Sequence, residues 1–325
     1  MKRIPLLIGA FALVCLACLA SAGAVAQNWP TKAIRVIVPF TAGSGTDIAA
    51  RAVTERLGAI LGQILVVENR PGAGGTIGQA IVAKADPDGY TILVHSSSQT
   101  VTPSTYPNLP FDMLTDFSGI TMLANIPNVL VTAPGKGIGS VKELIGAAKA
   151  KPGSLNYASA GAGSATQLNA ERFKLGAGID AVHVPYKGTP EAIADLVAGR
   201  VDYYFCPIVN ALPLVKGGKL LALAVGSSKR ASALPDVPTT EEAGVPNSAY
   251  NFWVGMFVPS KTPRDIVARL HAETVKALQS PEVKERYARL GAETQIFTPE
   301  QFDVYIREEV ASNAALVRAA GIKVQ

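Results

Sequence analysis

The sequence predicts an α/β protein with two lobes, each built around a mostly parallel sheet that is flanked by helices. Short apolar runs rich in Val and Ile alternate with segments of helix length, which is typical of βαβ units. The chain of 325 residues is longer than the usual single domain. No Gly/Ser-rich or charged linker interrupts it, so we expect short ordered crossings between the lobes.

The first 26 residues have the pattern of a removable secretory signal. Two basic residues precede an apolar run over residues 4–19, and small residues then lead to Ala24-Val25-Ala26. The apolar run is shorter than the ~20 residues that a membrane-spanning helix needs. We expect cleavage after Ala26 and a mature chain in the periplasm that starts at Gln27. A retained N-terminal anchor and a lipid on Cys18 are the alternatives.

Charge and cysteine content exclude some functions. The net charge is +5, and no basic run is interleaved with aromatic residues, so we expect no nucleic-acid partner. Cys206 is the one cysteine after residue 26, so the mature chain must be stable without an internal disulfide. This suits a large periplasmic protein better than a small secreted domain.

The first lobe begins with three predicted strands, which are short, apolar and β-branched: residues 33–38, 64–67 and 90–94. Helices of residues 48–61 and 76–85 lie between them. Turn signals separate these elements at Asn69-Arg70-Pro71-Gly72 and Asp86-Pro87-Asp88-Gly89.

The same alternation resumes after residue 128. The predicted strands are residues 129–132, 155–158, 181–184, 201–205 and 220–225. The predicted helices are residues 141–150, 166–174 and 190–198.

The C-terminal part returns to one strand and then becomes helical. Residues 252–258 form the strand, and helices follow at 264–279 and from 299 to about 319. We place the crossings near 125–128 and 248–252. Lobe 1 is then discontinuous, with residues 27–126 and 250–325, and lobe 2 has residues 127–249.

Two loops between a strand and a helix carry the predicted binding chemistry. Open parallel sheets bind ligands beyond the carboxyl ends of their strands. Residues 39–47 follow the first strand, and their two glycines let the backbone approach a ligand. The helix start beyond them favours a carboxylate or a phosphate. The alternative is that Gly43 and Gly45 only make the turn, while Asp47 caps the helix.

The second loop, residues 159–164, has the same character in the other lobe. Small residues, hydroxyls and a helix start again lie together. Neither loop contains Lys or Arg, so backbone amides and hydroxyls must meet the ligand charge. Two such loops, one in each lobe, indicate a cleft that is lined from both sides.

Other motifs give little support for catalysis. Gly72-Ala73-Gly74-Gly75-Thr76-Ile77-Gly78 fails the spacing of a dinucleotide fingerprint, and we interpret it as a tight turn. The three histidines have no metal-ligand spacing, and no nucleophile elbow, P-loop or zinc motif is present. We interpret His95 as structural and Cys206 as an inert buried thiol. We therefore expect no enzyme activity, no cofactor and no metal.

Motifs spread over nearly the whole mature chain resemble the receptors of tripartite tricarboxylate transporters, also called Bug receptors. They begin with Val38-Pro39-Phe40-Thr41-Ala42-Gly43-Ser44-Gly45-Thr46-Asp47. They continue with Glu68-Asn69-Arg70-Pro71-Gly72-Ala73-Gly74-Gly75, Asp86-Pro87-Asp88-Gly89-Tyr90, Leu109-Pro110-Phe111-Asp112, His183-Val184-Pro185-Tyr186-Lys187-Gly188 and Leu234-Pro235-Asp236-Val237-Pro238-Thr239.

The resemblance implies a two-lobed periplasmic binding protein of the Venus-flytrap type, which closes on a di- or tricarboxylate, an amino acid or an aromatic acid. It also implies membrane transporter subunits as partners, and we expect a monomer. The expected ligand-binding residues are Phe40, Thr41, Ala42, Gly43, Ser44, Gly45, Asp47, Ser97, Ser159, Ala160, Gly163, Ser164, Thr166, Tyr186, Asp202 and Cys206. Many relatives have a His near Gln167 and a polar residue near Cys206, so the ligand identity does not transfer.

Two other functions stay open at this level. One is a ligand-sensing subunit that binds a membrane histidine kinase, because sensing and uptake need the same closing trap. The other is a secreted hydrolase that uses His95 or Asp47. Turnover of candidate esters or phosphates would distinguish the hydrolase.

Overall fold

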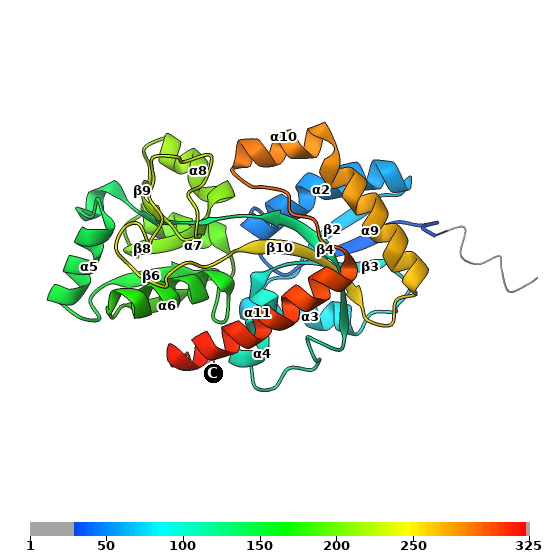
Figure 1. The fold of residues 1–325 in the computed structure, drawn as a ribbon, viewed down its shortest axis with the longest axis horizontal. Coiled ribbons are helices and arrows are strands. Elements are labelled where there is room, and N and C mark those ends of the chain that lie inside the picture. The colour runs from blue at the N-terminus through cyan, green and yellow to red at the C-terminus, as the bar shows by residue number, and fades with distance from the viewer. Residues whose placement is uncertain (1–28, 323–325) are drawn as a thin grey trace, which may run out of the picture.

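Two five-stranded sheets form the centres of two lobes in this computed structural model, which describes residues 29–322 (Figure 1). The predicted signal and the cysteine at 18 lie outside these residues. In lobe 1 the strands are β1 (Ile34–Val38), β2 (Leu65–Asn69), β3 (Thr91–Ser96), β4 (Phe117–Asn125) and β10 (Trp253–Pro259), in the order β2-β1-β3-β10-β4.

The sheet of lobe 2 repeats this arrangement. Its strands are β5 (Asn128–Thr132), β6 (Asn156–Ser159), β7 (Val182–Pro185), β8 (Tyr203–Pro207) and β9 (Leu221–Val225), in the order β7-β6-β8-β5-β9. Four strands of each sheet share one direction, and only β10 and β5 run the other way. Each reversed strand enters its sheet from the other lobe and lies between two neighbours, so both sheets are mixed.

Helices cover both faces of each sheet. In lobe 1 they are α2 (Gly45–Leu61), α3 (Thr76–Ala83), α4 (Thr102–Thr105), α9 (Arg264–Gln279), α10 (Pro281–Leu290) and α11 (Pro299–Ala319), with short 3-10 turns η1 (Ala73–Gly75) and η2 (Ser97–Thr100). In lobe 2 they are α5 (Val141–Ala150), α6 (Ala165–Ala177), α7 (Thr189–Val197) and α8 (Ile208–Lys216), with η3 (Pro134–Lys136).

The continuous apolar strands are explained by burial on both faces. In β1, Val36 and Val38 pack on the side of α2 and α9, whereas Ile37 packs with Phe302 of α11. Successive side chains of a strand point to opposite faces, so a strand between two helical layers is apolar on both sides where it is buried. Arg35, which is exposed near the amino end of β1, is the exception. In β5, Leu130 is likewise separated from its two valine neighbours.

Two crossings connect the lobes side by side. Residues 126–127 join β4 to β5, and residues 226–252 lead from β9 back to β10. The Ile126 amide donates to the Phe252 carbonyl at 2.8 Å, and the Tyr250 amide donates to the Gly226 carbonyl at 2.7 Å. From the C-terminal part of the chain, α10 reaches α8 and α11 reaches α6 of lobe 2 (Figure 1).

The sequence did not predict β4, α8, α10 or the short α4. In β4, Ser118 and Gly119 interrupt the apolar residues, and Met122 and Leu123 suit a helix equally well, so the segment has no clear period. Pro213 inside α8 masked the helical pattern there. Over residues 29–322, no helix has the length and apolar character needed to cross a membrane.

Candidate ligand-binding site

A small cavity lies where the carboxyl ends of the strands of both lobes meet. Lobe 1 lines it with Phe40, Ser44, Gly45, Thr46, Ser96, Ser98 and Phe252, and lobe 2 lines it with Ala160, Ser164, Thr166, Thr189 and Pro207. Seven of these twelve residues carry a hydroxyl, and no charged side chain of the described residues lines the cavity. A cavity of about 10 Å³ has room for roughly one water molecule.

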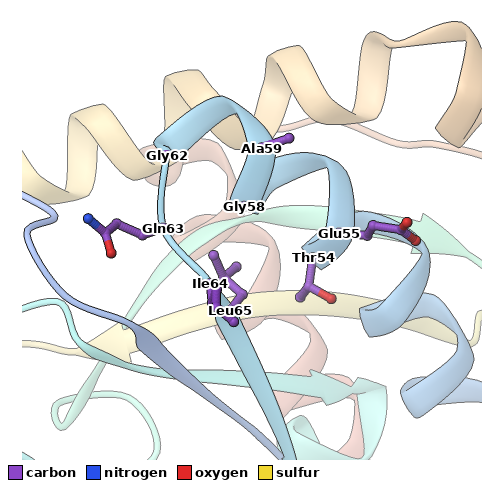
Figure 2. A pocket seen from close by; sticks show the side chains of 8 residues that line it. All are labelled: Thr54, Glu55, Gly58, Ala59, Gly62, Gln63, Ile64 and Leu65. Carbon is purple, nitrogen blue, oxygen red and sulfur yellow. The ribbon is translucent and has the colours of Figure 1, made fainter.

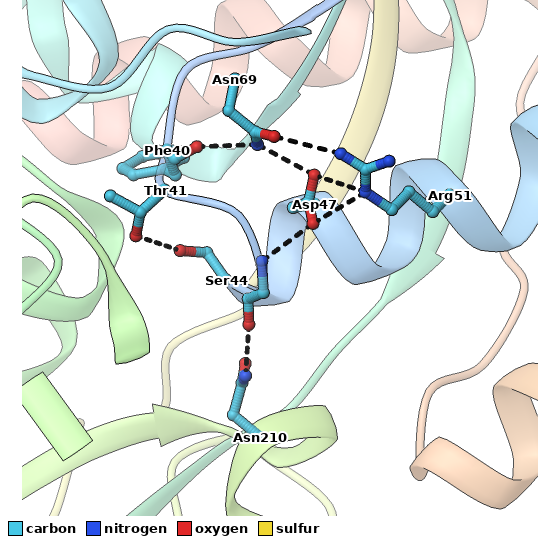
Figure 3. A network of polar contacts seen from close by, with 8 residues as sticks. Phe40, Thr41, Ser44, Asp47, Arg51, Asn69 and Asn210 are labelled. Carbon is cyan, nitrogen blue, oxygen red and sulfur yellow. Dashed lines mark hydrogen bonds and ion pairs between the residues drawn. The ribbon is translucent and has the colours of Figure 1, made fainter. Parts of the chain in front are cut away.

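The β1–α2 loop is held in place by the carboxylate of Asp47 (Figure 3). This carboxylate accepts hydrogen bonds from the Gly43 amide at 2.9 Å, from Arg51 Nε at 3.0 Å and from Asn69 Nδ2 at 2.9 Å. Asn69 Nδ2 also donates to the Phe40 carbonyl at 3.0 Å. Asp47 is buried and does not line the cavity. It therefore fixes the conformation of the loop without facing the ligand.

Hydroxyls organise the β6–α6 loop in the other lobe. Ser164 caps α6 by accepting from the Gln167 amide at 3.3 Å, and Thr166 Oγ1 accepts from the Ala160 amide at 2.9 Å. Ser159 is fully buried, and its hydroxyl contacts His183 Nε2 at 2.6 Å. Ser164 and Thr166 therefore face the cavity, whereas Ser159 supports the loop.

Direct hydrogen bonds join the two lobes around the cavity. The Ala165 amide at the start of α6 donates to Ser98 Oγ at 2.8 Å. Asn210 Nδ2 of α8 donates to the Gly43 carbonyl at 2.7 Å (Figure 3).

Two further contacts cross between the β1–α2 loop and the start of α7. Thr41 Oγ1 donates to Glu191 Oε2 at 3.0 Å, and the Thr189 amide donates to Ser44 Oγ at 3.3 Å. The loops predicted to grip a ligand thus also form the contact surface between the lobes.

The structure brings together Phe40, Ser44, Gly45, Ala160, Ser164 and Thr166 of the predicted binding residues. Six others belong to the same loops without lining the cavity. Thr41, Asp47 and Ser159 make the contacts described above, and Ala42 is exposed. Gly43 bonds Asp47 and Asn210, and the Gly163 amide donates to Gln167 Oε1 at 2.7 Å.

Four predicted residues lie elsewhere. Ser97 is buried beside the cavity in η2, and Tyr186 lines an open groove next to it, where its hydroxyl donates to Asp195 at 2.7 Å. Cys206 precedes Pro207 and is buried in the hydrophobic core, where burial raises the pKa of its thiol well above the usual value. Asp202 lies at the amino end of β8, about 16 Å along the strand from Pro207.

Sequence reasoning missed Thr46, Ser96, Ser98, Thr189, Pro207 and Phe252. The serines carried a usable signal, because they directly follow a predicted strand and so fall at the edge where the loops meet. Pro207 and Phe252 carried none, since each is an apolar residue at the end of an apolar segment.

Neutral groups dominate the electrostatics around the site. Burial lowers the pKa of His95 to about 3, and burial with the nearby Lys174 lowers the pKa of His183 to about 4. Both rings are therefore uncharged near pH 7. A ligand anion must be met by the amides at the starts of α2 and α6 and by hydroxyls.

Two of the larger hollows in the described residues differ from this cavity. One of about 640 Å³ lies at the amino end of β2, lined by Thr54, Glu55, Gly58 and residues 62–65 among others (Figure 2). This hollow lies at the amino ends of the strands, whereas the cavity lies at their carboxyl ends, and few polar side chains line it. The other is the open groove of about 420 Å³ beside the cavity, which Lys187 and Glu191 border. Within residues 29–322, no cluster of His, Cys, Asp or Glu could hold a metal ion.

The two-lobed fold, with helix starts from both lobes around one cavity, defines the class of periplasmic binding proteins. Comparison with known proteins specifies the family within that class. The model of the tripartite tricarboxylate transporter family receptor matches residues 49–322. Protein BugT of Bordetella pertussis is 38% identical over 302 residues, which cover 92% of this chain and 93% of BugT.

Two solved structures of Rhodopseudomonas palustris proteins are also similar. Rpa4515, solved with adipate, has a TM-score of 0.88 and 33% identity, covering 91% of this chain and 99% of that one. MatC, solved with bound malate, has a TM-score of 0.85 and 33% identity, covering 89% and 100%. The chain belongs to the tripartite tricarboxylate transporter receptor family. As predicted from the sequence, it is a solute-binding receptor and not an enzyme.

Proposed function

We propose that this receptor works in the periplasm, where it captures a small carboxylate between its lobes and delivers it to the membrane subunits of a tripartite tricarboxylate-type transporter. The observation that carries the proposal is the convergence of two helix starts, α2 and α6, on one cavity lined by hydroxyls. Such groups suit a carboxylate without the help of a basic side chain.

Capture requires the lobes to move. A small carboxylate is larger than the single water that the cavity accommodates, so the lobes must separate to admit it. The paired crossings at residues 126–127 and 226–252 are the natural hinge. Lobe 1 then comprises residues 27–126 and 250–325, and lobe 2 residues 127–249. Because a ligand contacts both sides only when the lobes are together, binding shifts the equilibrium toward closure.

The ligand class follows from the site and from the relatives. Adipate and malate are bound by two similar proteins. We propose a di- or tricarboxylate, an amino acid or an aromatic acid for this chain, which acts as a monomer after removal of residues 1–26.

Native mass spectrometry of freshly purified protein from the periplasm tests the proposal. We expect a mature chain that starts at Gln27 and carries a small acid as a noncovalent adduct. Titration calorimetry with malate, adipate, citrate, glutamate and benzoate then ranks the classes. A lipid at Cys18, or absence of binding to every acid together with an adduct that has no carboxylate, contradicts the proposal.

A further inference from the structure

Some glycines at the contact surface between the lobes leave no room for a β-carbon, because atoms of the other lobe lie too close. Gly188 precedes α7 and has φ −178° and ψ −177°, an extended conformation that any residue adopts. A β-carbon there would overlap Thr41 Oγ1 and lie 2.6 Å from Ser44 Oγ, both on lobe 1. The position needs glycine because lobe 1 occupies the place of a side chain.

At Gly45 the roles of the lobes are exchanged: the glycine belongs to lobe 1, and the atoms close to it belong to lobe 2. It is the first residue of α2 in lobe 1, and a β-carbon there would lie 2.9 Å from Cβ of Pro207 in lobe 2. Real β-carbons essentially never come so close to another heavy atom, and the proline ring cannot rotate away. At both Gly188 and Gly45, therefore, atoms of the opposite lobe exclude a side chain.

A third contact gives a role to the glycine-rich stretch that the sequence assigned to a tight turn. A β-carbon at Gly74 of η1 would overlap the carbonyl oxygen of Ala162 in lobe 2. Tyr106 Oη donates to that same carbonyl at 2.8 Å. Three glycines on separate segments thus let backbone and short side chains of the two lobes meet.

We propose that Gly188 and Gly45 are positioning residues that determine whether the lobes can close on a ligand, with Gly188 acting without touching the cavity. In separated lobes, a methyl group at residue 188 faces solvent and costs little. When the lobes approach, it displaces the hydroxyls of Thr41 and Ser44, which bond Glu191 and the Thr189 amide. Closure is opposed while each lobe keeps its fold.

This inference rests on the proposed capture between lobes, and Gly188→Ser is the variant that tests it best. Serine is a preferred residue at a helix N-cap, so α7 keeps its start, whereas Gly188→Ala would also weaken the cap. Gly135→Ala is the matched control. Gly135 lies in η3 of the same lobe, and a β-carbon there meets nothing within 4 Å.

Each variant is measured by calorimetry with malate and adipate, by stopped-flow dissociation, and by small-angle scattering with and without acid. For Gly188→Ser we expect unfolding without ligand as in the wild type. Affinity falls at least about tenfold, dissociation is faster, and the radius of gyration no longer contracts on adding acid. Gly135→Ala should match the wild type in every measurement.

The outcomes separate this inference from the proposed function. If the wild type binds and contracts, and Gly188→Ser binds and contracts equally, the role of Gly188 is wrong although the proposed function stands. If the wild type binds no acid or never contracts, capture between the lobes is itself wrong, and the role of Gly188 falls with it.

Discussion

Ser98 Oγ of lobe 1 accepts a hydrogen bond of 2.8 Å from the amide of Ala165 in lobe 2. This amide belongs to the first turn of α6, where backbone N–H groups lack partners within the helix. The Ser98 hydroxyl of the opposite lobe thus accepts from an α6 amide that, in the proposed function, would donate to the carboxylate of the ligand. Ligand and lobe 1 are expected to use the same donor.

Replacing Ser164 by alanine should weaken ligand binding beyond its effect on stability. Ser164 caps α6 and lines the cavity, whereas Ser140 caps α5 in the same way, accepting from the Glu143 amide at 3.2 Å. Both Ser→Ala variants should lose about 1 kcal/mol of unfolding free energy. Only Ser164→Ala should lose affinity, roughly 10- to 150-fold by calorimetry. Equal affinities in the two variants would place the ligand away from α6.

Asp47 should act on binding through the loop that it holds. Its buried carboxylate joins the Gly43 amide, Arg51 and Asn69. Asp47→Asn loses the charge of that acceptor and should lower the unfolding free energy by about 2 kcal/mol. Affinity should fall as well, because the loop amides lose their fixed direction.

The control for Asp47 is Glu55→Gln on the same helix. Glu55 pairs with Arg286 at 3.4 Å, and its side chain is 74% exposed. Exposed pairs contribute little to stability, so urea unfolding and calorimetry should show almost no change. An Asp47→Asn variant with wild-type affinity would show that the loop does not depend on its carboxylate.

Acid should destabilise the protein through the half-buried His183 and the buried His95. His183 has its pKa lowered from 6.5 to about 4 in the folded protein. Between these values the unfolded chain binds the proton and the folded chain does not. The contribution of His183 to stability is therefore complete above pH 6.5 and is lost as the pH falls toward 4. The slope is at most about 1.4 kcal/mol per pH unit.

Urea unfolding at pH 7.5 and pH 5 measures this effect. His183→Gln should lose less stability on acidification than the wild type. His271→Gln on α9 is the control, because it leaves the surroundings of His183 in lobe 2 unchanged. The same acid sensitivity in all three proteins would locate the titrating group elsewhere, for instance at His95, where burial also lowers the pKa.

Local sequence patterns predicted the parts of the site that follow from one segment. The loops 39–47 and 159–164 each combine a strand end, glycines and a helix start within ten residues, and both reach the cavity. The alternation of strands and helices likewise predicted most of the fold. The reversed strands β5 and β10 were predicted as strands, but their direction depends on the crossings, which no local pattern encodes.

Asp202 was predicted to bind the ligand but lies away from the cavity, because the sequence pattern did not show where β8 begins. The apolar run 201–205 placed it inside a strand, yet β8 begins at Tyr203. Its carboxylate instead accepts from the Asn156 amide at 2.7 Å and pairs with Lys136 at 2.7 Å, at the amino edge of the sheet. Phe252 reaches the cavity from more than 200 residues beyond Phe40 in the chain, a proximity that only the packed lobes create.

Backbone amides, and not a lysine, should neutralise the charge of the ligand. Lys187 is a basic side chain close to the site, but it borders the open groove and not the cavity. It is exposed and forms no ion pair with any of the described residues. Solvent therefore screens its charge, and Lys187→Met should change affinity by less than about threefold.

Gly43→Val should do far more harm, because Gly43 has φ +81°, a conformation that valine strongly disfavours. A β-carbon would approach no closer than 3.6 Å to Pro190, so strain and not bulk is the cause. The backbone must leave this conformation and move both the amide bonded to Asp47 and the carbonyl bonded to Asn210. Calorimetry of the two variants with the same acid decides between amides and lysine. If Lys187→Met abolishes binding while Gly43→Val binds normally, a lysine holds the carboxylate and the amide site is wrong.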